Sequence, residues 1–474
     1  MAGSKADAAS RARLERMREL LADEREPRLK RTSSEYGKSL RKAVPRDVFS
    51  FWQPPLGRSN GADLVFEQDL ACEPWLVEIR HARMAANPFA FYRGAAVVMA
   101  QDLQSLPTTG VEVQAVGDAH IANFGLFRSP DGHFVFDVRD FEETTRAPWE
   151  WDVARLAASV EICGRASGLS ERQRDEAVLA CVESYRTRMR ELGEMGNLCV
   201  WYAHADLGAL PAKLVGGPAK RGRGKRRGTG GPGATLRFAE LEDGTLRIAS
   251  APPEIVPLGE LAQVSGCDAG EDIERDRAIS LILRNYRSTL PPECARLFES
   301  YRGCDVAHKL VGVGGVWTRA WIVVFEGADE RDPLVLQVKE ARESVLERYV
   351  GKAAQPNHGQ RVVEGQRSMQ AVRDVFLGWT SLPDDDGETR DYYVRQLWDA
   401  VCPIDLDAIS AKALRGFAKA AADALACVHA RTGDRFAIAS YLGRSDRFDY
   451  ALVSFAHTYA DQNERDYQDF CERV

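Results

Sequence analysis

Two stretches of the chain decide the fold: Val116-Gly117-Asp118-Ala119-His120-Ile121-Ala122-Asn123-Phe124-Gly125 and, shortly after it, Phe134-Val135-Phe136-Asp137-Val138-Arg139-Asp140-Phe141. Short apolar runs at 124–127 and 134–136 flank Ser129-Pro130-Asp131-Gly132. Asp and Gly favour the backbone conformations of a tight turn, and aromatic residues pair well across neighbouring strands. The two stretches therefore predict a β-hairpin with polar side chains before its first strand and at the end of its second strand.

The polar side chains that flank the predicted hairpin are Asp118, Asn123, Asp137 and Asp140. Carboxylate and amide oxygens suit Mg²⁺, which usually keeps water ligands and is shared with substrate phosphates. We therefore predict a metal site formed by Asn123 with Asp137 or Asp140, of which Asp137 has the better spacing. Asp118 is predicted to accept or orient the proton of an attacking group. The competing interpretation is a polar turn in which Asp118 and Asn123 cap backbone groups.

Four neighbouring residues complete this candidate site. His120 is a catalytic candidate, but it is interpreted as a histidine that braces the loop in preference to a base. Asp152 opens a helix near 148–157 and is predicted to hold the loop through hydrogen bonds. Arg83 and Arg93 are candidate phosphate contacts, because Arg forks match phosphate oxygens. The alternative is that these two arginines cover apolar surface or pair with acids.

Length and composition indicate a globular protein with more than one substructure. The chain has 474 residues, too many for one small core. The apolar fraction of 45% and the charged fraction of 28% are ordinary for a globular protein. Ten cysteines include no C-x-x-C pair, which disfavours a zinc knuckle or a disulfide framework and indicates reduced thiols.

The sequence also indicates which classes of partner to expect and where in the cell the protein is located. No apolar run approaches the ~20 residues needed to cross a bilayer, and the charged N-terminus lacks the apolar core of a signal peptide. These patterns predict a cytoplasmic protein without a membrane partner. The net charge of −7 disfavours nucleic acid as a partner. The Gly-rich basic segment 216–234 is predicted to be a disordered loop.

The segment 308–397 has the pattern of a small twisted sheet with one helix. In the strand 334–339, Leu334, Leu336 and Val338 should face one side and Lys339 the other. A glycine loop precedes this strand, a helix over 358–378 follows it, and 391–397 is the last strand. Glycines let the backbone approach phosphates, and a strand lysine oriented by an acid can bind phosphate oxygens. The predicted nucleotide-binding residues are Gly312, Gly314, Gly315, Lys339, Glu364 and Gln396.

This order of parts is similar to the nucleotide lobe of protein kinases, although Trp317 stands where a third loop glycine belongs. The loop 117–123 resembles the G-D-x-H-x-x-N loop of aminoglycoside and choline kinases. In these kinases a metal-binding Asp lies on a strand, and Phe136-Asp137 resembles it by position. Asp140-Phe141 is the better match to the D-F dipeptide in which that Asp occurs. Trp151-Asp152-Val153-Ala154 resembles the helix that follows in those enzymes.

From about Arg80 to its end, the chain resembles the bacterial family numbered 2252 among domains of unknown function. The stretches that carry this resemblance are 88–94, 117–125, 136–143, 148–159, 336–341 and 359–366. The loop near Asp118 precedes Lys339, the reverse of the kinase order, and 428–431 resembles the helix that normally runs into that loop. The resemblance therefore implies an α+β, protein-kinase-like two-lobed fold that is circularly permuted, with the catalytic half first.

Four parts are expected along the chain. Residues 1–45 form an N-terminal arm, and 46–300 form the catalytic part with the disordered basic loop 216–234. Residues 301–400 form the nucleotide-binding part, and 401–474 form a helical part that returns to the catalytic lobe.

The resemblance to kinases implies an ATP- and Mg²⁺-dependent phosphotransferase acting on an unknown small-molecule or protein acceptor. One alternative is a nucleotidyl transferase on the same fold. The other is a catalytically degraded, nucleotide-binding regulatory module, which Trp317 favours and the retained Asp118 and Lys339 oppose.

Overall fold

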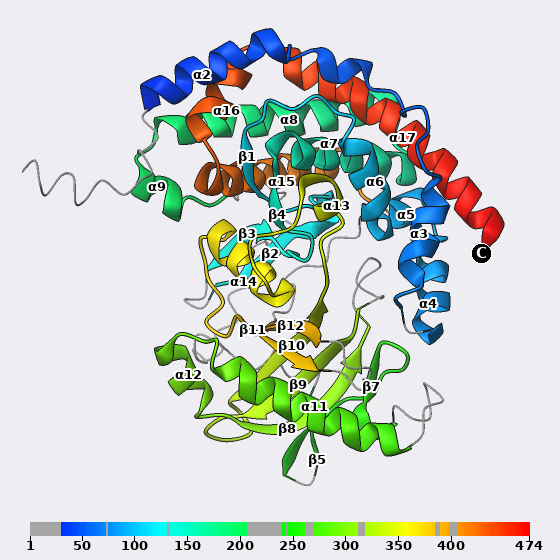
Figure 1. Ribbon diagram of the computed structural model, residues 1–474, viewed down its shortest axis with the longest axis vertical. Coiled ribbons are helices and arrows are strands. Elements are labelled where there is room, and N and C mark those ends of the chain that lie inside the picture. The colour runs from blue at the N-terminus through cyan, green and yellow to red at the C-terminus, as the bar shows by residue number, and fades with distance from the viewer. Residues whose placement is uncertain are drawn as a thin grey trace, which may run out of the picture.

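The computed structural model describes residues 30–72, 74–129, 133–205, 239–242, 244–260, 269–310, 318–383, 389–397, 406 and 408–474. Over these residues the protein has an α+β fold, with a helical half above a half built around one antiparallel sheet (Figure 1). The predicted basic loop 216–234 and the glycine loop with Gly312, Gly314 and Gly315 lie outside the described residues.

Both ends of the described chain contribute to the helical half (Figure 1). α7 and α8 pack against α15 and α17 around an apolar core in which the rings of Trp149 and Tyr185 stack at 5.8 Å. The helices of this half are α2 (Lys30–Ala43), η1 (Val48–Phe51), α3 (Gly61–Asp69), α4 (Pro74–Met84), α5 (Pro88–Gly94), α6 (Ala96–Leu103), η2 (Ile121–Asn123), α7 (Trp149–Ala166), α8 (Glu171–Glu194), α9 (Asn197–Tyr202), α15 (Ala411–Thr432), α16 (Arg435–Leu442) and α17 (Arg447–Arg473). Its strands are β1 (Glu112–Ala115), β2 (Phe124–Arg128), β3 (Phe134–Val138) and β4 (Thr145–Pro148).

The N-terminal segment is tied to the C-terminal helices. The described part of the expected arm, α2, packs on α16. Arg41 Nε donates to the carbonyl of Tyr441 at 2.9 Å, and Arg46 Nη1 donates to that of Leu442 at 2.7 Å. These carbonyls lie at the end of α16, where a helix leaves its acceptors unpaired, so the two arginines complete its last turn.

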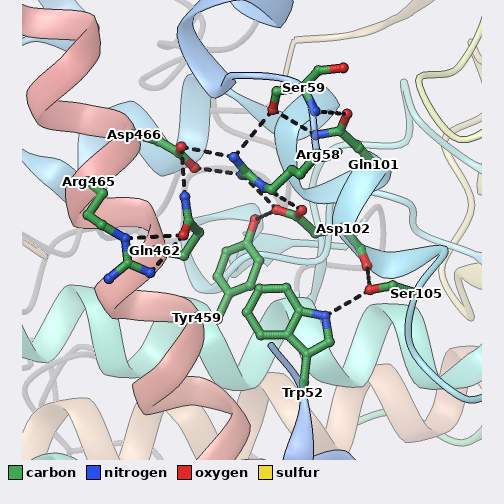
Figure 2. Close-up of polar contacts among 10 residues, drawn as sticks. All are labelled: Trp52, Arg58, Ser59, Gln101, Asp102, Ser105, Tyr459, Gln462, Arg465 and Asp466. Carbon is green, nitrogen blue, oxygen red and sulfur yellow. Dashed lines mark hydrogen bonds and ion pairs between the residues drawn. The ribbon is translucent and has the colours of Figure 1, made fainter. Parts of the chain in front are cut away.

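A buried network of charges joins the segment after α2 to α17 (Figure 2). Arg58 donates from Nε to Asp102 Oδ1 and from Nη2 to Asp466 Oδ2, each at 2.6 Å. The Tyr459 hydroxyl donates to Asp102 at 3.2 Å, and the Gln462 amide donates to Asp466 at 3.0 Å. The three charged side chains are at most 8% exposed. One guanidinium therefore neutralises two buried carboxylates and fixes α6 to α17.

The second half is a six-stranded sheet in the order β11-β12-β10-β9-β8-β7, with every neighbouring pair antiparallel. Its strands, with those of a separate hairpin, are β5 (Ala239–Glu242), β6 (Thr245–Ile248), β7 (Ile255–Pro257), β8 (Arg302–Lys309), β9 (Ala320–Glu326), β10 (Pro333–Ala341), β11 (Gly378–Pro383) and β12 (Thr389–Gln396). Its helices are η5 (Leu258–Glu260), α11 (Ala269–Arg287) and α12 (Pro292–Phe298). Between the two halves, α14 (His358–Met369) packs on both β11 and α15, and the short α13 (Glu347–Val350) lies against β4 of the helical half (Figure 1).

The two faces of the sheet bury different clusters. Leu334, Leu336 and Val338 of β10 pack with residues of α11 and α12. Val335 belongs to the cluster on the opposite face, beneath the β5–β6 hairpin. Because side chains alternate along a strand, Lys339 shares the face of Val335. The alternation predicted for β10 is confirmed.

The structure corrects two expected boundaries. The helix expected over 358–378 ends at Met369, because Gln370 takes an extended conformation and donates its amide to the Val138 carbonyl at 3.0 Å. β11 then begins at Gly378. The sheet half also begins before residue 301, since β7 pairs with β8 and the β5–β6 hairpin packs on it. None of the described helices is both long enough and apolar enough to span a membrane.

Candidate functional site

The predicted hairpin is present and positions the polar loop. β2 and β3 pair antiparallel, with Gly125 opposite Asp137. Just ahead of β2, the carbonyl of Asn123 accepts a hydrogen bond from the backbone N–H of Arg139 at 2.8 Å. This bond joins the loop before β2 to the residue after β3. The segments that carry Asp118 and Asp140 therefore belong to one small unit.

Buried groups hold the backbone of this loop, as predicted for Asp152. Its carboxylate on α7 accepts from the N–H of Val116 at 2.7 Å and from that of Gly117 at 3.0 Å. His429 Nε2, near the end of α15, lies 3.1 Å from Asp152 Oδ2, and His429 Nδ1 lies 2.7 Å from the Tyr185 hydroxyl. Three helices thus converge on the loop through one chain of hydrogen bonds.

Asp118 is held by a buried arginine. Arg155 Nε and Nη2 both lie 2.5 Å from Asp118 Oδ1. Tyr92 fixes Arg155 in turn: the guanidinium lies 4.2 Å from the ring centroid, and the Tyr92 hydroxyl donates to the Arg155 carbonyl at 2.8 Å. Burial alone would lower the pKa of Arg155, but the negative charge of Asp118 raises it above its ordinary value. Arg155 therefore stays charged and fixes one oxygen of Asp118.

Asn123 and His120 face the second oxygen of Asp118. Asn123 Nδ2 donates to the Asp118 carbonyl at 2.8 Å and lies 3.4 Å from Oδ2. His120 Nε2 lies 3.5 Å from the same Oδ2. Burial lowers the pKa of His120 well below its usual range, and the positive charges of Arg155 and Arg93 lower it further. A buried, neutral imidazole fits the bracing role predicted for His120.

The loop has little room at Gly117, and this gives a stability prediction. Gly117 has a φ of +84°, and an added Cβ would lie 2.1 Å from the Glu143 carbonyl oxygen. Gly168 has a φ of +69° with no atom near an added Cβ, which makes Gly168→Ala a matched control. We expect Gly117→Ala to lose about 1–3 kcal/mol more than Gly168→Ala in denaturant unfolding, because only Gly117 is overpacked. Equal losses would show that the loop can move away from Glu143.

Lys339 reaches the hairpin half through a residue that sequence analysis missed. It lies on β10 with Tyr393 of β12 opposite, and only 1% of it is exposed. Its ammonium group forms an ion pair with Glu142, and the Tyr393 hydroxyl donates to the same carboxylate oxygen at 2.7 Å. Glu142 follows Asp140 closely, so Lys339 lies where the two halves meet.

This pairing corrects the role expected of Glu364. Glu364 of α14 accepts from the side chains of Gln355 at 2.9 Å and Gln360 at 2.7 Å. The α14 side chain that faces the segment after β3 is Arg361 instead. Arg361 Nη1 donates to the carbonyls of Glu142 at 2.9 Å and Thr144 at 2.6 Å. α14 therefore supplies a cation that holds the segment after β3. That segment in turn supplies Glu142, the acid that pairs with Lys339.

The two candidate metal ligands lie in different surroundings. Asp137 is buried and accepts from the backbone N–H of Val138 at 2.9 Å. Burial raises the pKa of Asp137 to about 6, against the positive charges of Arg431 and His204. Asp140 Oδ1 instead accepts from the N–H of Glu142 at 3.1 Å, beside the partner of Lys339. Of the two, Asp140 is the one whose carboxylate bonds next to the Lys339 partner, and the choice between them as a metal ligand stays a prediction.

The donor set limits which metal ions would fit. Among the described residues, no three His, Cys, Asp or Glu side chains form a group that could hold a metal ion. Mg²⁺ needs only one or two protein ligands when substrate phosphates supply the others. Two oxygen ligands such as Asn123 and Asp140 would therefore suit only an ion whose other ligands come from a bound substrate and water.

Gln396 ends β12, opposite Leu336. Its backbone N–H donates to Asp374 Oδ2 at 2.7 Å, and its side chain is half-buried. Asp374 thus holds the end of this strand in place. The predicted role of Gln396 in binding a nucleotide stays a prediction.

Of the two missed residues, Arg155 and Glu142, a signal in the sequence could have found the first. Arg155 lies three positions after Asp152, and residues at this spacing share one face of a helix. It could have been expected to face the same loop. Glu142 stands beside Glu143 after the Asp140-Phe141 dipeptide, but nothing in the local pattern connects it to a strand near residue 339.

Most of the chain matches one family of known proteins. The family model described as "Uncharacterized protein conserved in bacteria (DUF2252)" matches residues 73–473. The chain belongs to the DUF2252 family. No curated protein and no solved structure matches it. The matched region of this DUF2252 protein includes both Asp118 and Lys339, so the two halves of the candidate site belong to the same family unit.

Proposed function

We propose that this DUF2252 protein is an ATP- and Mg²⁺-dependent phosphotransferase that acts on a small-molecule or protein acceptor. The observation that carries the proposal is the junction at Glu142, where Lys339 of the sheet meets the segment that begins at Asp140. Asp118 is joined to that segment through the bond between Asn123 and Arg139. Phosphoryl transfer needs a phosphate-binding cation, a metal-binding oxygen and a group that orients the nucleophile, and these residues supply all three.

Each residue has a role that its contacts support. The Lys339 ammonium has three donors, and the ion pair with Glu142 leaves others for phosphate oxygens. Arg155 holds Asp118 Oδ1, so Oδ2 is the oxygen that would accept the proton of the acceptor hydroxyl. Asn123 and Asp140 would hold the Mg²⁺ ion. When bound, the ion neutralises charge on the nucleotide phosphates.

The end of α15 supports a circularly permuted, kinase-like two-lobed arrangement as part of this proposal. Thr432 Oγ1 accepts from the N–H of Gln114 in β1 at 3.2 Å, and the Thr432 carbonyl accepts from Arg146 Nη1 at 2.9 Å. β1 leads directly to the loop with Asp118. α15 therefore ends where, in the unpermuted order, a helix would run into the catalytic loop.

A nucleotide-binding module without turnover is the second candidate. Arg155 favours it, because the guanidinium already engages one oxygen of Asp118 and stabilises its charge. The position of a radiolabel separates the remaining possibilities. Transfer from γ-labelled ATP indicates a kinase, transfer from α-labelled ATP indicates a nucleotidyl transferase, and binding without transfer indicates the module.

The test of the nucleotide site is the Lys339→Met variant. It keeps the aliphatic stem but removes the charge, so Mg²⁺–ATP affinity in calorimetry should fall by at least about tenfold, the value of one charged hydrogen bond. Lys352→Met, at an exposed lysine, is the control and should bind like wild type. Melting curves report whether the unpaired Glu142 destabilises the fold. Unchanged ATP affinity in a folded Lys339→Met protein would contradict the proposed role of Lys339.

A further inference from the structure

A chain of buried side chains leads from the N-terminal segment to the loop that carries Asp118. Arg58 begins this chain, and Arg155 of α7 ends it. The side chains between them come from three other helices and are each at most 2% exposed: Asp102 of α6, Tyr459 of α17 and Tyr92 of α5. The contacts described above join Arg58 to α17 and Arg155 to Asp118, but they leave the connection between these two pairs without a role.

The first link joins the N-terminal segment to Tyr459 (Figure 2). Arg58 Nη2 donates to Asp102 Oδ2 at 2.9 Å, and the Tyr459 hydroxyl donates to the same oxygen at 3.2 Å. The ring of Trp52 lies 5.3 Å from that of Tyr459, between centroids. A buried carboxylate needs its hydrogen-bond donors, so the loss of Arg58 would change how Asp102 bonds to Tyr459. Two residues of the N-terminal segment therefore fix the position of this tyrosine.

The second link joins α17 to α5. The rings of Tyr459 and Tyr92 meet edge to face, with their centroids 6.1 Å apart and an angle of 76° between the planes. One turn further along α17, Asn463 Nδ2 donates to the carbonyl of Pro88, the first residue of α5, at 3.0 Å. Residues four positions apart share one face of a helix. The same face of α17 therefore contacts both the start of α5 and its tyrosine.

The third link joins Tyr92 to Arg155. Besides the ring and hydroxyl contacts described above, the Tyr92 carbonyl accepts from Arg155 Nη2 at 3.1 Å. Arg155 is thus held at three points by one residue, and it holds Asp118 Oδ1 in turn. Protein interiors are close-packed, so a shift of one buried side chain is passed to its neighbours. A displaced Tyr92 would move the guanidinium away from Asp118.

We propose that the N-terminal segment orders the loop with Asp118 through this chain, and that Arg58, Tyr459 and Tyr92 are positioning residues for Asp118. Arg58 lies ahead of residues 73–473, which the family model matches. The ordering of the loop is a property of the fold, whereas its consequence for turnover rests on the proposed phosphotransferase function. With Oδ1 fixed, Oδ2 points in one direction, toward Asn123 and His120.

The test follows amide hydrogen exchange in the full-length Arg58→Met protein. The backbone N–H groups of Val116, Gly117 and Ile121 are hydrogen-bonded to side chains of α7, so their exchange rates report on the order of the loop. Exchange over 116–123 should rise by about three- to tenfold, the range that the net loss of one hydrogen bond gives. Strand β9, in the sheet half, should exchange at the wild-type rate. Faster exchange confined to α17 and α6 would overturn the proposal, because Arg58 would then anchor only those helices.

Arg165→Met is the matched control. Arg165 also ties α17 to α7, since it pairs with Asp461 at 2.6 Å and with the buried Glu161 at 2.8 Å. It lies ten positions after Arg155, which is roughly 15 Å further along α7. This variant should loosen α17 near Asp461 and leave exchange of the loop unchanged. An equal rise over 116–123 would show that any lost contact of α17 loosens the loop, and the proposed chain would be wrong.

Tyr92→Phe tests the last link with a milder change. It keeps the ring over Arg155 and removes the hydroxyl that bonds to the Arg155 carbonyl, so exchange over 116–123 should rise again. In the double variant with Arg58→Met, the rise should be smaller than the product of the two single effects, because both changes break one chain. Effects that multiply would indicate independent routes to the loop and would overturn the proposal.

Amide exchange separates this inference from the proposed reaction, because it reports on the loop whether or not the protein transfers phosphate. If the protein binds no nucleotide but both variants loosen the loop, the positioning chain stands and the phosphotransferase proposal fails. In an active protein, Arg58→Met should lower kcat several-fold and leave the KM for Mg²⁺–ATP unchanged, since the Lys339–Glu142 pair is not part of the chain. Wild-type kcat together with wild-type exchange of the loop would overturn the chain and leave the phosphotransferase proposal intact.

Discussion

Phosphoryl transfer by the Asp118→Asn variant should fall by about 10²–10⁴-fold, while its affinity for Mg²⁺–ATP stays within a few-fold of wild type. Asn keeps an oxygen for Arg155 but replaces the second carboxylate oxygen, which faces Asn123 and His120, with an amide that cannot accept a proton. The Lys339–Glu142 pair does not involve Asp118, so the groups that would bind nucleotide are unchanged. The loss should therefore appear in turnover and not in binding.

The measurement compares label transfer from γ-labelled ATP with calorimetric binding of Mg²⁺–ATP. Asp461→Asn is the matched control, because this carboxylate is 59% exposed and pairs with Arg165 at the surface. It should transfer label at the wild-type rate. A wild-type transfer rate in Asp118→Asn would exclude Asp118 as the proton acceptor. Loss of both binding and transfer would indicate that Asp118 acts mainly in holding the loop.

Arg58→Met should lower the free energy of unfolding by about 3–5 kcal/mol, the usual cost of removing one partner of a buried ion pair. The variant leaves Asp102 and Asp466 buried without their cation, since both carboxylates bond to Arg58 (Figure 2). Burial raises the pKa of Asp102, and the charge of Asp466 raises it further, so removing Arg58 should favour protonation of Asp102. The measurement is denaturant unfolding at neutral pH.

Two further variants control this prediction. Arg83→Met removes a more exposed ion pair with Glu254 and should cost at most about 1 kcal/mol. Adding Asp466→Asn to Arg58→Met should recover part of the lost stability, because one uncompensated charge disappears. If Arg58→Met costs no more than Arg83→Met, the network at α17 does not hold the N-terminal segment in place.

The local patterns of the sequence predicted the parts of the site that depend on neighbours along the chain. The β2–β3 hairpin follows from a turn between two apolar runs, and the structure has it. The alternation that separates Lys339 from Leu336 and Val338 follows from the period of a strand, and the packing confirms it. Asp152 was expected to hold the loop because it opens the next helix, and its hydrogen bonds to Val116 and Gly117 do so.

The parts that sequence analysis missed depend on contacts between distant segments. Glu142 pairs with Lys339 because β10 and the loop after β3 meet in space, which no local pattern indicates. The helix α14 was expected to supply an acid at Glu364, but it turns Arg361 toward the loop instead. Hydrophobic periodicity predicts that a helix exists and gives little information on which polar residue faces a partner.

The N-terminal segment shows a third limit of prediction from the sequence. Arg58 precedes residues 73–473, the region that the DUF2252 family model matches, yet it bonds to Asp466 near the end of α17. Its charge and its position in the sequence gave no reason to expect burial, since Arg is mostly exposed unless it is paired. The structure therefore extends the folded unit ahead of the family match.

Titration of the wild-type protein with ATP, with and without Mg²⁺, tests the central claim most directly. The arrangement of Lys339, Asn123 and Asp140 predicts saturable binding that depends on the divalent cation and is lost on chelation. No detectable nucleotide binding with either Mg²⁺ or Mn²⁺ would contradict both the phosphotransferase and the nucleotide-binding module.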